Sequence, residues 1–317
     1  MVTRLVLDLD PGLGDALAAV VAMLDPELEL LALTAVAGAV PAQQASYNVQ
    51  ALVQLVDPPR WPRLGSAVEG PLPASAGDDH RRQLASLNGA NGLADLKPAV
   101  PDLHNRRESP RVLVELVREF PHEITLVTLG PLTNLALACD RAPDFLELLG
   151  GLVILGGAAG EGGDVTAAAE FNIFHDPDSA ARIFTGDEPR TLLPLEATAP
   201  VVLTMEDCHL LTQRSGPAGD LLRKIVPYAL RRQHEVSGIE GLPVREVAAV
   251  AAVARPYLFQ TRRVRVDIET SGEFTRGMTV FDRRRTPVVS QPANTNVVKE
   301  IDLPGLLAYV QSVMAAK

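Results

Sequence analysis

Residues 3–24, TRLVLDLDPGLGDALAAVVAML, constrain the fold of this chain more than any other segment. An apolar run containing two acids, Asp8 and Asp10, passes through a short Pro-Gly turn into an alanine-rich helix that begins at Asp15. Strand alternation places Asp8 and Asp10 on one face at the carboxyl end of the strand, and Asp15 lies just across the turn. The segment therefore predicts a strand, a tight loop and a helix, with three carboxylates close together.

Carboxylates this close repel one another, so the chain must protonate one, solvate them or neutralise them with a cation. An oxygen-rich pocket suits a hard divalent ion, calcium or magnesium. The alternative is ordinary helix capping and dipole chemistry. Gly12 and Gly14 lack the third glycine of a dinucleotide-binding loop, and no Gly-Lys-Ser/Thr follows as in a phosphate-binding loop. The pair Asp8 and Asp10 also occurs in haloacid-dehalogenase-type phosphatases, which are a competing interpretation of this segment alone.

Charge and cysteine content narrow the class of protein. The chain has 317 residues and a formal net charge of −10, which argues against a nucleic-acid or anionic-membrane partner. The sequence shows neither a signal peptide nor an apolar span of about 20 residues, so we expect no membrane segment. Cys139 and Cys208 are far apart and lack metal-ligand spacing. Unpaired thiols in a cytoplasmic protein are the expectation.

Strand-like and helical patterns alternate along most of the chain. Near-continuous apolar runs predict parallel strands buried on both faces. After the first strand, these runs are residues 28–36, 61–64, 123–128, 152–155 and 190–195. The helices expected between them are residues 43–56, 109–120, 132–139 and 176–183. Residues 67–100 are rich in Gly, Pro, Asp and Asn, and we expect a long functional loop there.

The last third of the chain is less regular. It contains helical patterns at residues 219–235, 243–253 and 303–314, a strand at 296–301, and an alternating stretch at 264–281 that predicts an antiparallel hairpin. No linker is visible, so we expect one α/β domain over residues 1–317. Its mostly parallel, doubly wound sheet should be flanked by helices, with the hairpin at its edge and sites at the carboxyl ends of the strands.

Several sequence blocks, taken in order, resemble the inosine-uridine nucleoside hydrolase family over essentially the whole chain. The blocks are Asp8-Leu9-Asp10-Pro11-Gly12 with Asp15-Ala16, then Gly130-Pro131-Leu132-Thr133-Asn134-Leu135-Ala136, then Gly156-Gly157, and finally Ala169-Glu170-Phe171-Asn172. The phosphatase interpretation requires a lysine and a further acidic motif in other places, and it explains none of the later blocks. The chain is identified by this resemblance as a divergent member of the hydrolase family.

The resemblance implies a calcium ion at the strand ends that holds the ribose diol and the attacking water. Asp10 would bind the metal and act as general base, Asp15 would ligate the ion, and the backbone carbonyl of Leu129 would complete the shell. The reaction would be hydrolysis of the N-glycosidic bond of a nucleoside. Carboxylates also stabilise an oxocarbenium-like sugar, and water bound to calcium is only modestly acidified, so a carboxylate such as Asp10 must take its proton.

The resemblance also implies the sugar contacts and the assembly. Glu170 and Asn172 would hydrogen-bond the sugar hydroxyls, and Phe171 would form a wall of the pocket. A homodimer or homotetramer is implied as well. The partners expected are therefore a nucleoside or related riboside and further copies of the chain, with no nucleic acid and no membrane.

Some positions depart from the family pattern. Two consecutive acids are usual where this chain has Gly14-Asp15, so the acid that normally holds a ribose hydroxyl is missing. Ala39 stands in place of an asparagine, and Asn88 in place of a histidine in the long loop. Asp164 stands where an asparagine contacts the sugar. Asn88 and Asp164 are nevertheless candidate substrate-binding residues, because their positions match the family's site.

The late helix carries the largest departure, since a His-Asp pair is replaced by Arg245-Glu246. Glu246 is one methylene longer than aspartate and still a candidate metal ligand. Arg245 cannot replace an imidazole at the leaving base, but its planar fork could contact a substrate phosphate or carboxylate. An ion pair with Glu246, Asp15 or another nearby acid is the alternative. His80 and His234 lie in regions expected to border the pocket, where either could protonate a leaving base or simply be solvated.

These departures leave three functional hypotheses. The first is a calcium-dependent N-ribohydrolase with an atypical site and an altered sugar or base. The second is a catalytically impaired family member that binds a ligand or regulates. The third is standard purine or pyrimidine nucleoside hydrolysis. Each lost hydrogen bond to a charged group costs about 1.5–3 kcal/mol, so several losses without replacement would be severe for the usual substrate.

Overall fold

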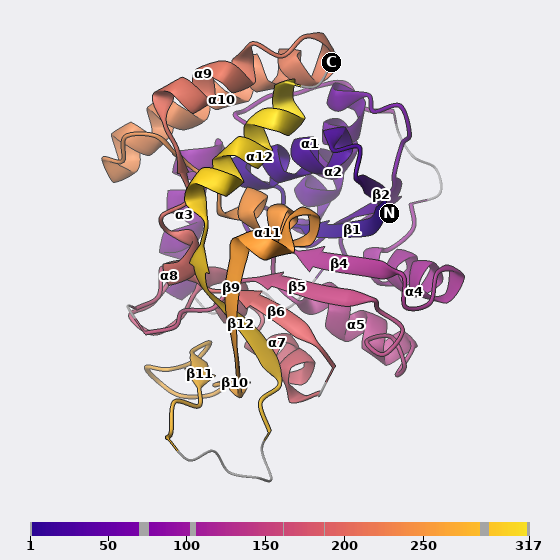
Figure 1. Ribbon diagram of the computed structural model, residues 1–317, viewed down its shortest axis with the longest axis vertical. Helices are drawn as coiled ribbons and strands as arrows, with labels where there is room; N and C mark the ends of the chain where they lie inside the picture. The colour runs from indigo at the N-terminus through magenta and orange to yellow at the C-terminus, as the bar shows by residue number, and fades with distance from the viewer. Residues whose placement is uncertain are drawn as a thin grey trace.

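The molecule is built around a central β-sheet, and the candidate site lies at the ends of its strands (Figure 1). The computed structural model describes residues 2–69, 76–101, 106–160, 162–186, 188–285 and 292–315. Within these ranges the strands of the central sheet are β1 (Thr3–Leu9), β2 (Leu28–Ala35), β3 (Arg63–Gly65), β4 (Ile124–Thr128), β5 (Gly151–Leu155), β6 (Arg190–Leu193), β9 (Phe259–Val264) and β12 (Thr295–Ile301). Their order is β3–β2–β1–β4–β5–β6–β12–β9. All neighbours are parallel except β9, which is antiparallel to β12.

This order contains a topological switch point between β1 and β4. From β1 the chain runs outward through β2 to β3, and it then returns to the other side of β1 to form β4. The connections after β1 and β4 therefore diverge and leave a crevice at the carboxyl ends of these two strands, where ligands of open α/β sheets bind. Asp10 follows β1 and Leu129 follows β4 at this crevice.

Helices cover both faces of the sheet, each over its own apolar core. One core packs α1 (Leu13–Leu24), α2 (Ala42–Val56), α9 (Met205–Thr212), α10 (Gly216–Ser237), α11 (Arg245–Ala254) and α12 (Leu303–Ala315). The other core packs α4 (Ser109–Glu119), α5 (Thr133–Arg141) and α7 (Pro177–Thr185). Along β1, Leu5, Leu7 and Leu9 belong to the first core and Val6 to the second, as strand alternation requires.

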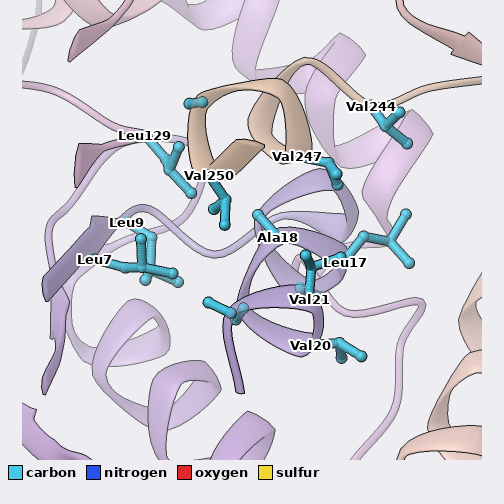
Figure 2. Close-up of a cluster of buried hydrophobic side chains, with 14 of the residues drawn as sticks. Leu7, Leu9, Leu17, Ala18, Val20, Val21, Leu129, Val244, Val247 and Val250 are labelled. Carbon is cyan, nitrogen blue, oxygen red and sulfur yellow. The ribbon is translucent and has the colours of Figure 1, made fainter. Parts of the chain in front are cut away.

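The contact between α1 and α11 matters most for the site. Both helices are rich in alanine, and small side chains let two helices pack closely. Ala18 and Val21 of α1 lie beside Val247 and Val250 of α11, with the leucines of β1 next to them (Figure 2). This packing fixes the first turn of α11, which carries Glu246, beside the first turn of α1.

Shorter elements complete the described chain. They are α3 (Ala76–Asn88), α6 (Phe171–His175), α8 (Leu195–Thr198), η1 (Pro256–Leu258), β7 (Val202–Leu203), β8 (Leu242–Pro243), β10 (Val266–Ile268) and β11 (Thr279–Phe281). The antiparallel pairs β7–β8 and β10–β11 form two small sheets of their own. Every helix in the described ranges is too short or too polar to span a bilayer.

The structure confirms the predicted α/β class and corrects two elements. Residues 67–100 are not entirely a loop, because α3 occupies Ala76–Asn88. The low hydrophobicity of this helix gives it a loop-like composition, because only one of its sides packs against the protein. On that side, Arg232 of α10 donates to the carbonyl of Ser86. The predicted hairpin at 264–281 exists as β10–β11, but the antiparallel edge strand of the main sheet is β9, just before it.

Candidate functional site

A polar pocket opens at the carboxyl ends of β1 and β4. Carboxylates of Asp10, Asp15, Glu170 and Glu246 line it together with Phe171 and Asn172. All the site residues nominated from the sequence reach this pocket except His234, and Gly14 and Ala39 also lie on its wall. Segments more than two hundred residues apart thus contribute to one cavity, as the switch point predicts.

Asp10 is held tightly by backbone. Its side chain is buried, and its Oδ2 accepts a hydrogen bond of 2.8 Å from the amide of Ala39. A Cβ at Gly38 would lie 2.2 Å from this Oδ2, and one at Gly130 would lie 2.7 Å from Oδ1. A side chain at either position would therefore displace the carboxylate of Asp10. Burial raises the pKa of Asp10 to about 8, and the nearby charges of Glu246 and Glu170 add to the rise.

Asp15 lies in the first turn of α1 and turns one oxygen back to its own helix. Its Oδ2 accepts from the amide of Gly12 at 3.0 Å, while its Oδ1 is buried without a hydrogen-bond partner. Burial raises its pKa well above the usual range, and Asp10 and Glu246 raise it further. The helix-capping interpretation thus accounts for one oxygen of Asp15. The other oxygen, Oδ1, is an acceptor without a partner near the carboxylates of Asp10 and Glu246.

The backbone carbonyl after β4 is positioned from two directions. The amide of Leu129 donates to the carbonyl of Asp8 at 2.7 Å, which extends the pairing of β4 with β1. Asn172 then donates its Nδ2 to the carbonyls of Leu129 at 2.7 Å and Leu155 at 3.0 Å. Asn172 therefore ties the ends of two neighbouring strands together at the floor of the pocket.

Asp8 supports the site from beneath rather than lining it. Its fully buried carboxylate accepts from Thr34 at 2.6 Å and from Asn134 at 2.8 Å. Asn134 also donates to the carbonyl of Ala35 at 2.9 Å, so it joins β1, β2 and α5. Burial raises the pKa of Asp8 to about 7. The sequence placed Asp8 and Asp10 on one strand face, and the structure gives them different tasks.

The carboxylates of Glu170 and Asp164 accept hydrogen bonds from backbone amides and so fix the wall of the pocket that contains Phe171. Glu170 caps the short helix α6 through its Oε2, which accepts from Gly157 at 2.9 Å and from Ile173 at 3.2 Å. Burial raises the pKa of Glu170 to about 7, and Asp164 adds to the rise. Asp164 Oδ1 accepts from the amide of Phe171 at 2.9 Å.

The opposite wall comes from α3 and α11. Asn88 Oδ1 accepts from the amide of Leu13 at 3.1 Å and so caps α1. The ring of His80 stacks on Phe171, with centroids 5.1 Å apart, and its Nδ1 is buried without a hydrogen-bond partner. Burial lowers the pKa of His80. Arg245 lies 3.7 Å from Asp164 through its guanidinium, so the ion pair expected with an acid is with this one.

The two candidate histidines differ in position. His234 is exposed on α10 and outside the pocket-lining set, whereas His80 lines the pocket from α3. The sequence indicates both histidines as candidates for the border of the pocket, and it does not predict the helix α3 that carries His80. The missed signal was spacing: His80, Leu84 and Asn88 recur every four residues, and all three line the pocket.

The donor set of the pocket is rich in oxygen. Within the described ranges, no group of three or more His, Cys, Asp or Glu side chains already has the geometry of a metal site. The chemistry nevertheless fits a hard cation, since the unpartnered Asp15 Oδ1 faces the charges of Asp10 and Glu246. Leu129 lines the same cavity, and its backbone carbonyl would add a neutral oxygen.

Comparison with known proteins decides the family. The sequence model described as inosine-uridine preferring nucleoside hydrolase matches residues 5–308. The chain belongs to this family. It is similar to the non-specific ribonucleoside hydrolase RihC of Escherichia coli, with 33% identity over 98% of this chain and 97% of the relative. It is also similar to uridine nucleosidase 1 of Arabidopsis thaliana, with 32% identity over 98% of this chain and 92% of the relative.

A solved structure of the family shares the whole architecture. The purine-preferring ribonucleoside hydrolase of Gardnerella vaginalis is 26% identical, with a TM-score of 0.88 and coverage of 98% of both chains. These nucleoside hydrolases are named as a non-specific, a uridine and a purine-preferring enzyme, so membership in the family leaves the base open.

Proposed function

We propose that the protein is a calcium-dependent N-ribohydrolase with an atypical active site, which cleaves the N-glycosidic bond of a nucleoside or related N-riboside. The similarity to named ribonucleoside hydrolases supports the reaction class. The observation that carries the proposal is the meeting of Asp10, Asp15 and Glu246 at the β1–β4 switch point, where Asp15 has a buried oxygen without a partner.

The proposed calcium ligands are the carboxylates of Asp10, Asp15 and Glu246 and the carbonyl of Leu129. Calcium prefers several oxygen ligands and tolerates variable geometry, which suits a mixed carboxylate and carbonyl set. When bound, the ion would orient the attacking water and the sugar hydroxyls and would neutralise the crowded carboxylates. Asn172 acts through Leu129, because the hydrogen bond from its Nδ2 fixes the carbonyl of Leu129, while a second one holds the carbonyl of Leu155.

Asp10 is the proposed general base. A water that attacks the anomeric carbon must lose a proton, and a buried carboxylate accepts a proton more readily than an exposed one. The amide of Ala39 and the two close glycines, Gly38 and Gly130, hold Asp10 in one orientation. This fixed position keeps the accepting oxygen from rotating away from the water.

Glu170 and Asn172 are the proposed contacts to the sugar hydroxyls, with Phe171 as an apolar wall. Because the Nδ2 of Asn172 is engaged by two carbonyls, its Oδ1 is the atom that can accept from a hydroxyl. The buried carboxylate of Glu170 also supplies negative charge on the side where an oxocarbenium-like sugar would develop positive charge.

The leaving base would lie beside the stacked rings of Phe171 and His80, the latter on α3. His80 stacks on Phe171 at this wall and is the proposed donor to the base, in place of the histidine that the family pattern has where this chain has Arg245. Asn88, Asp164 and Arg245 line the same side and complete the polar contacts. A wider cavity of about 330 Å³, lined partly by Gln83 and Gln233, continues outward from these residues and leaves room for a substituted base.

A base-release assay tests the proposal. Chelator-treated protein is given a panel of purine and pyrimidine ribonucleosides, with and without added calcium, and free base is measured. Calcium-dependent release that disappears in Asp10→Asn supports the hydrolase. Ligand binding without release would instead support the alternative, a catalytically impaired family member that binds or regulates.

The place and assembly of the protein are also part of the proposal. We place it in the cytoplasm as a homodimer or homotetramer, on the grounds of its two unpaired, buried cysteines and its family resemblance. Light scattering coupled to gel filtration measures the assembly, and a mass equal to that of one chain would contradict it.

A further inference from the structure

The carboxylate of Glu246 lies very close to the backbone of Gly14, a residue without a side chain. An ideal Cβ at Gly14 would lie 2.2 Å from Glu246 Oε2, 2.3 Å from Cδ and 2.7 Å from Oε1. The carboxylate of Glu246 therefore already fills the volume that any side chain at position 14 would need. Gly14 is helical and does not have a left-handed backbone, so the close approach, rather than a special φ, explains the glycine.

The length of Glu246 is the other half of this fit. Glu246 lies in the first turn of α11, which the apolar packing of Val247 and Val250 against α1 holds in place (Figure 2). From this anchor the side chain reaches across to the first turn of α1 and ends over Gly14. An aspartate on the same helix would end one methylene earlier, so it would leave the volume over Gly14 empty.

We propose that Gly14 and Glu246 form a matched pair, in which Glu246 brings its carboxylate from α11 to the place that a side chain at position 14 would occupy. This inference rests on the proposed function and deepens it. Both residues line the pocket with Glu170 and Asn172, so the carboxylate of Glu246 lies among the groups proposed to meet the sugar. The acid that α1 lacks is supplied by α11.

The same position makes Glu246 a link between two parts of the site. Glu246 lines the same cavity as Asp10 and Asp15, the two other carboxylates proposed to hold calcium. Moving its carboxylate away from Gly14 should therefore weaken calcium binding and sugar recognition together.

The pair predicts a particular behaviour of Gly14→Ala. The atoms that the new Cβ meets belong to the far end of a flexible side chain, so Glu246 can move aside and the protein should fold. Alanine also favours a helix more than glycine does, so the thermal unfolding temperature of the calcium-free protein should not fall. Calcium affinity and kcat/KM should each drop about tenfold or more, because a charged contact is displaced.

A double-variant cycle separates the pair from a general disturbance of the pocket. The variants are Gly14→Ala, Glu246→Asp and the combination, each measured by calcium titration calorimetry, thermal unfolding and base release. Because the shorter acid leaves room for a Cβ, adding Gly14→Ala to Glu246→Asp should change calcium affinity by less than about threefold. In the matched control background Arg245→Gln, Gly14→Ala should keep its full effect.

Additive effects of Gly14→Ala and Glu246→Asp on calcium affinity would overturn the proposed pair. If Gly14→Ala costs the same calcium affinity in the original chain as in the Glu246→Asp background, or if it costs nothing in the original chain, then the close approach has no functional weight. Failure of the proposed function is distinguishable, because calcium affinity and unfolding temperature are read without any turnover. A protein that releases no base can still show the coupling.

Discussion

The two halves of the pocket are built in different ways. The strand half (Asp10, Leu129, Glu170 and Asn172) comes from the segments that follow β1, β4 and β5, with Glu170 and Asn172 at the start of α6, and all four residues are at most 6% exposed. Backbone hydrogen bonds fix each of them. The helix half (His80, Asn88, Arg245 and Glu246) comes from α3 and α11 and is only partly buried. In the helix half, Arg245 makes one long ion pair and His80 has an unpartnered ring nitrogen.

This difference suggests a division of work. The strand half can hold the same geometry in many relatives, because the sheet itself sets it. The helix half can change its side chains without disturbing the sheet, and it is where this chain departs most from the family pattern. We therefore expect the strand half to carry the chemistry and the helix half to tune the substrate.

Removing the proposed base should have the largest effect. Asp10→Asn keeps the size of the side chain and its acceptor for the amide of Ala39, but it cannot take a proton from water. Base release should fall about a hundredfold to ten-thousandfold. Asp144→Asn, an exposed acid far from the pocket, is the matched control and should leave turnover unchanged. Release by Asp10→Asn within threefold of the original protein would remove Asp10 from its role.

The buried acids predict how the stability of the calcium-free protein depends on pH. The pKa values of Asp8 and Glu170 are about 7 and that of Asp10 is about 8, all above their ordinary values near 4. The folded state thus binds more protons than the unfolded state, and the free energy of unfolding should fall as pH rises from about 4 to about 8. His175 opposes this trend below its ordinary pKa of 6.5, because burial lowers its pKa to about 4.

Denaturant unfolding of chelator-treated protein at pH 6.5 and pH 8 measures this trend. Between pH 6.5 and pH 8 the opposing contribution of His175 is small, because most of it lies below pH 6.5, so the acids should dominate and stability should be lower at pH 8. Saturating calcium should remove most of the difference, because a cation would replace the protons among the carboxylates. Equal or higher stability at pH 8 without calcium would contradict the claim that burial raises the pKa values of these acids.

The variant Asn172→Ala tests whether the strand half depends on the hydrogen bonds from Asn172 to backbone carbonyls. Asn172→Ala leaves the carbonyls of Leu129 and Leu155 without their side-chain donor, which should cost about 1–3 kcal/mol of stability. Turnover should fall about tenfold to a hundredfold through the same loss. Unchanged unfolding and unchanged turnover would show that the ties are not needed.

Replacing His80 should have the smallest effect on base release among these variants, and His234 provides the control. His80→Gln removes the proposed donor to the leaving base and should lower kcat about tenfold, mainly for nucleosides whose base needs a proton. His234→Gln is the matched change on exposed α10 and should have no effect. If the two variants behave alike over the nucleoside panel, the helix half does not act on the base through His80.

The strand half was largely predictable from the sequence. Asp10 follows a strand pattern, so the rule for parallel sheets predicts its place at the crevice. The family resemblance, rather than spacing, indicates Leu129, Glu170 and Asn172. What the sequence could not show was the tether from Asn172 to Leu129, since it depends on the tertiary register of β4 and β5.

The helix half was less predictable for a physical reason. α3 is a polar helix with weak apolar patterning, so its helical spacing of His80, Leu84 and Asn88 was hidden in a loop-like composition. Gly14 was interpreted from the sequence as the loss of an acid. The structure adds that Glu246 fills the space over Gly14, a contact between residues far apart in the chain that no local pattern encodes.

Calcium titration calorimetry tests the central claim most directly. Chelator-treated protein should bind a single calcium ion per chain, and Asp15→Asn, which keeps the acceptor for the amide of Gly12 but loses the charge, should bind it about tenfold or more weakly. Base release measured on the same samples should follow the occupancy of calcium. No heat of binding, together with base release that persists in excess chelator, would contradict the account.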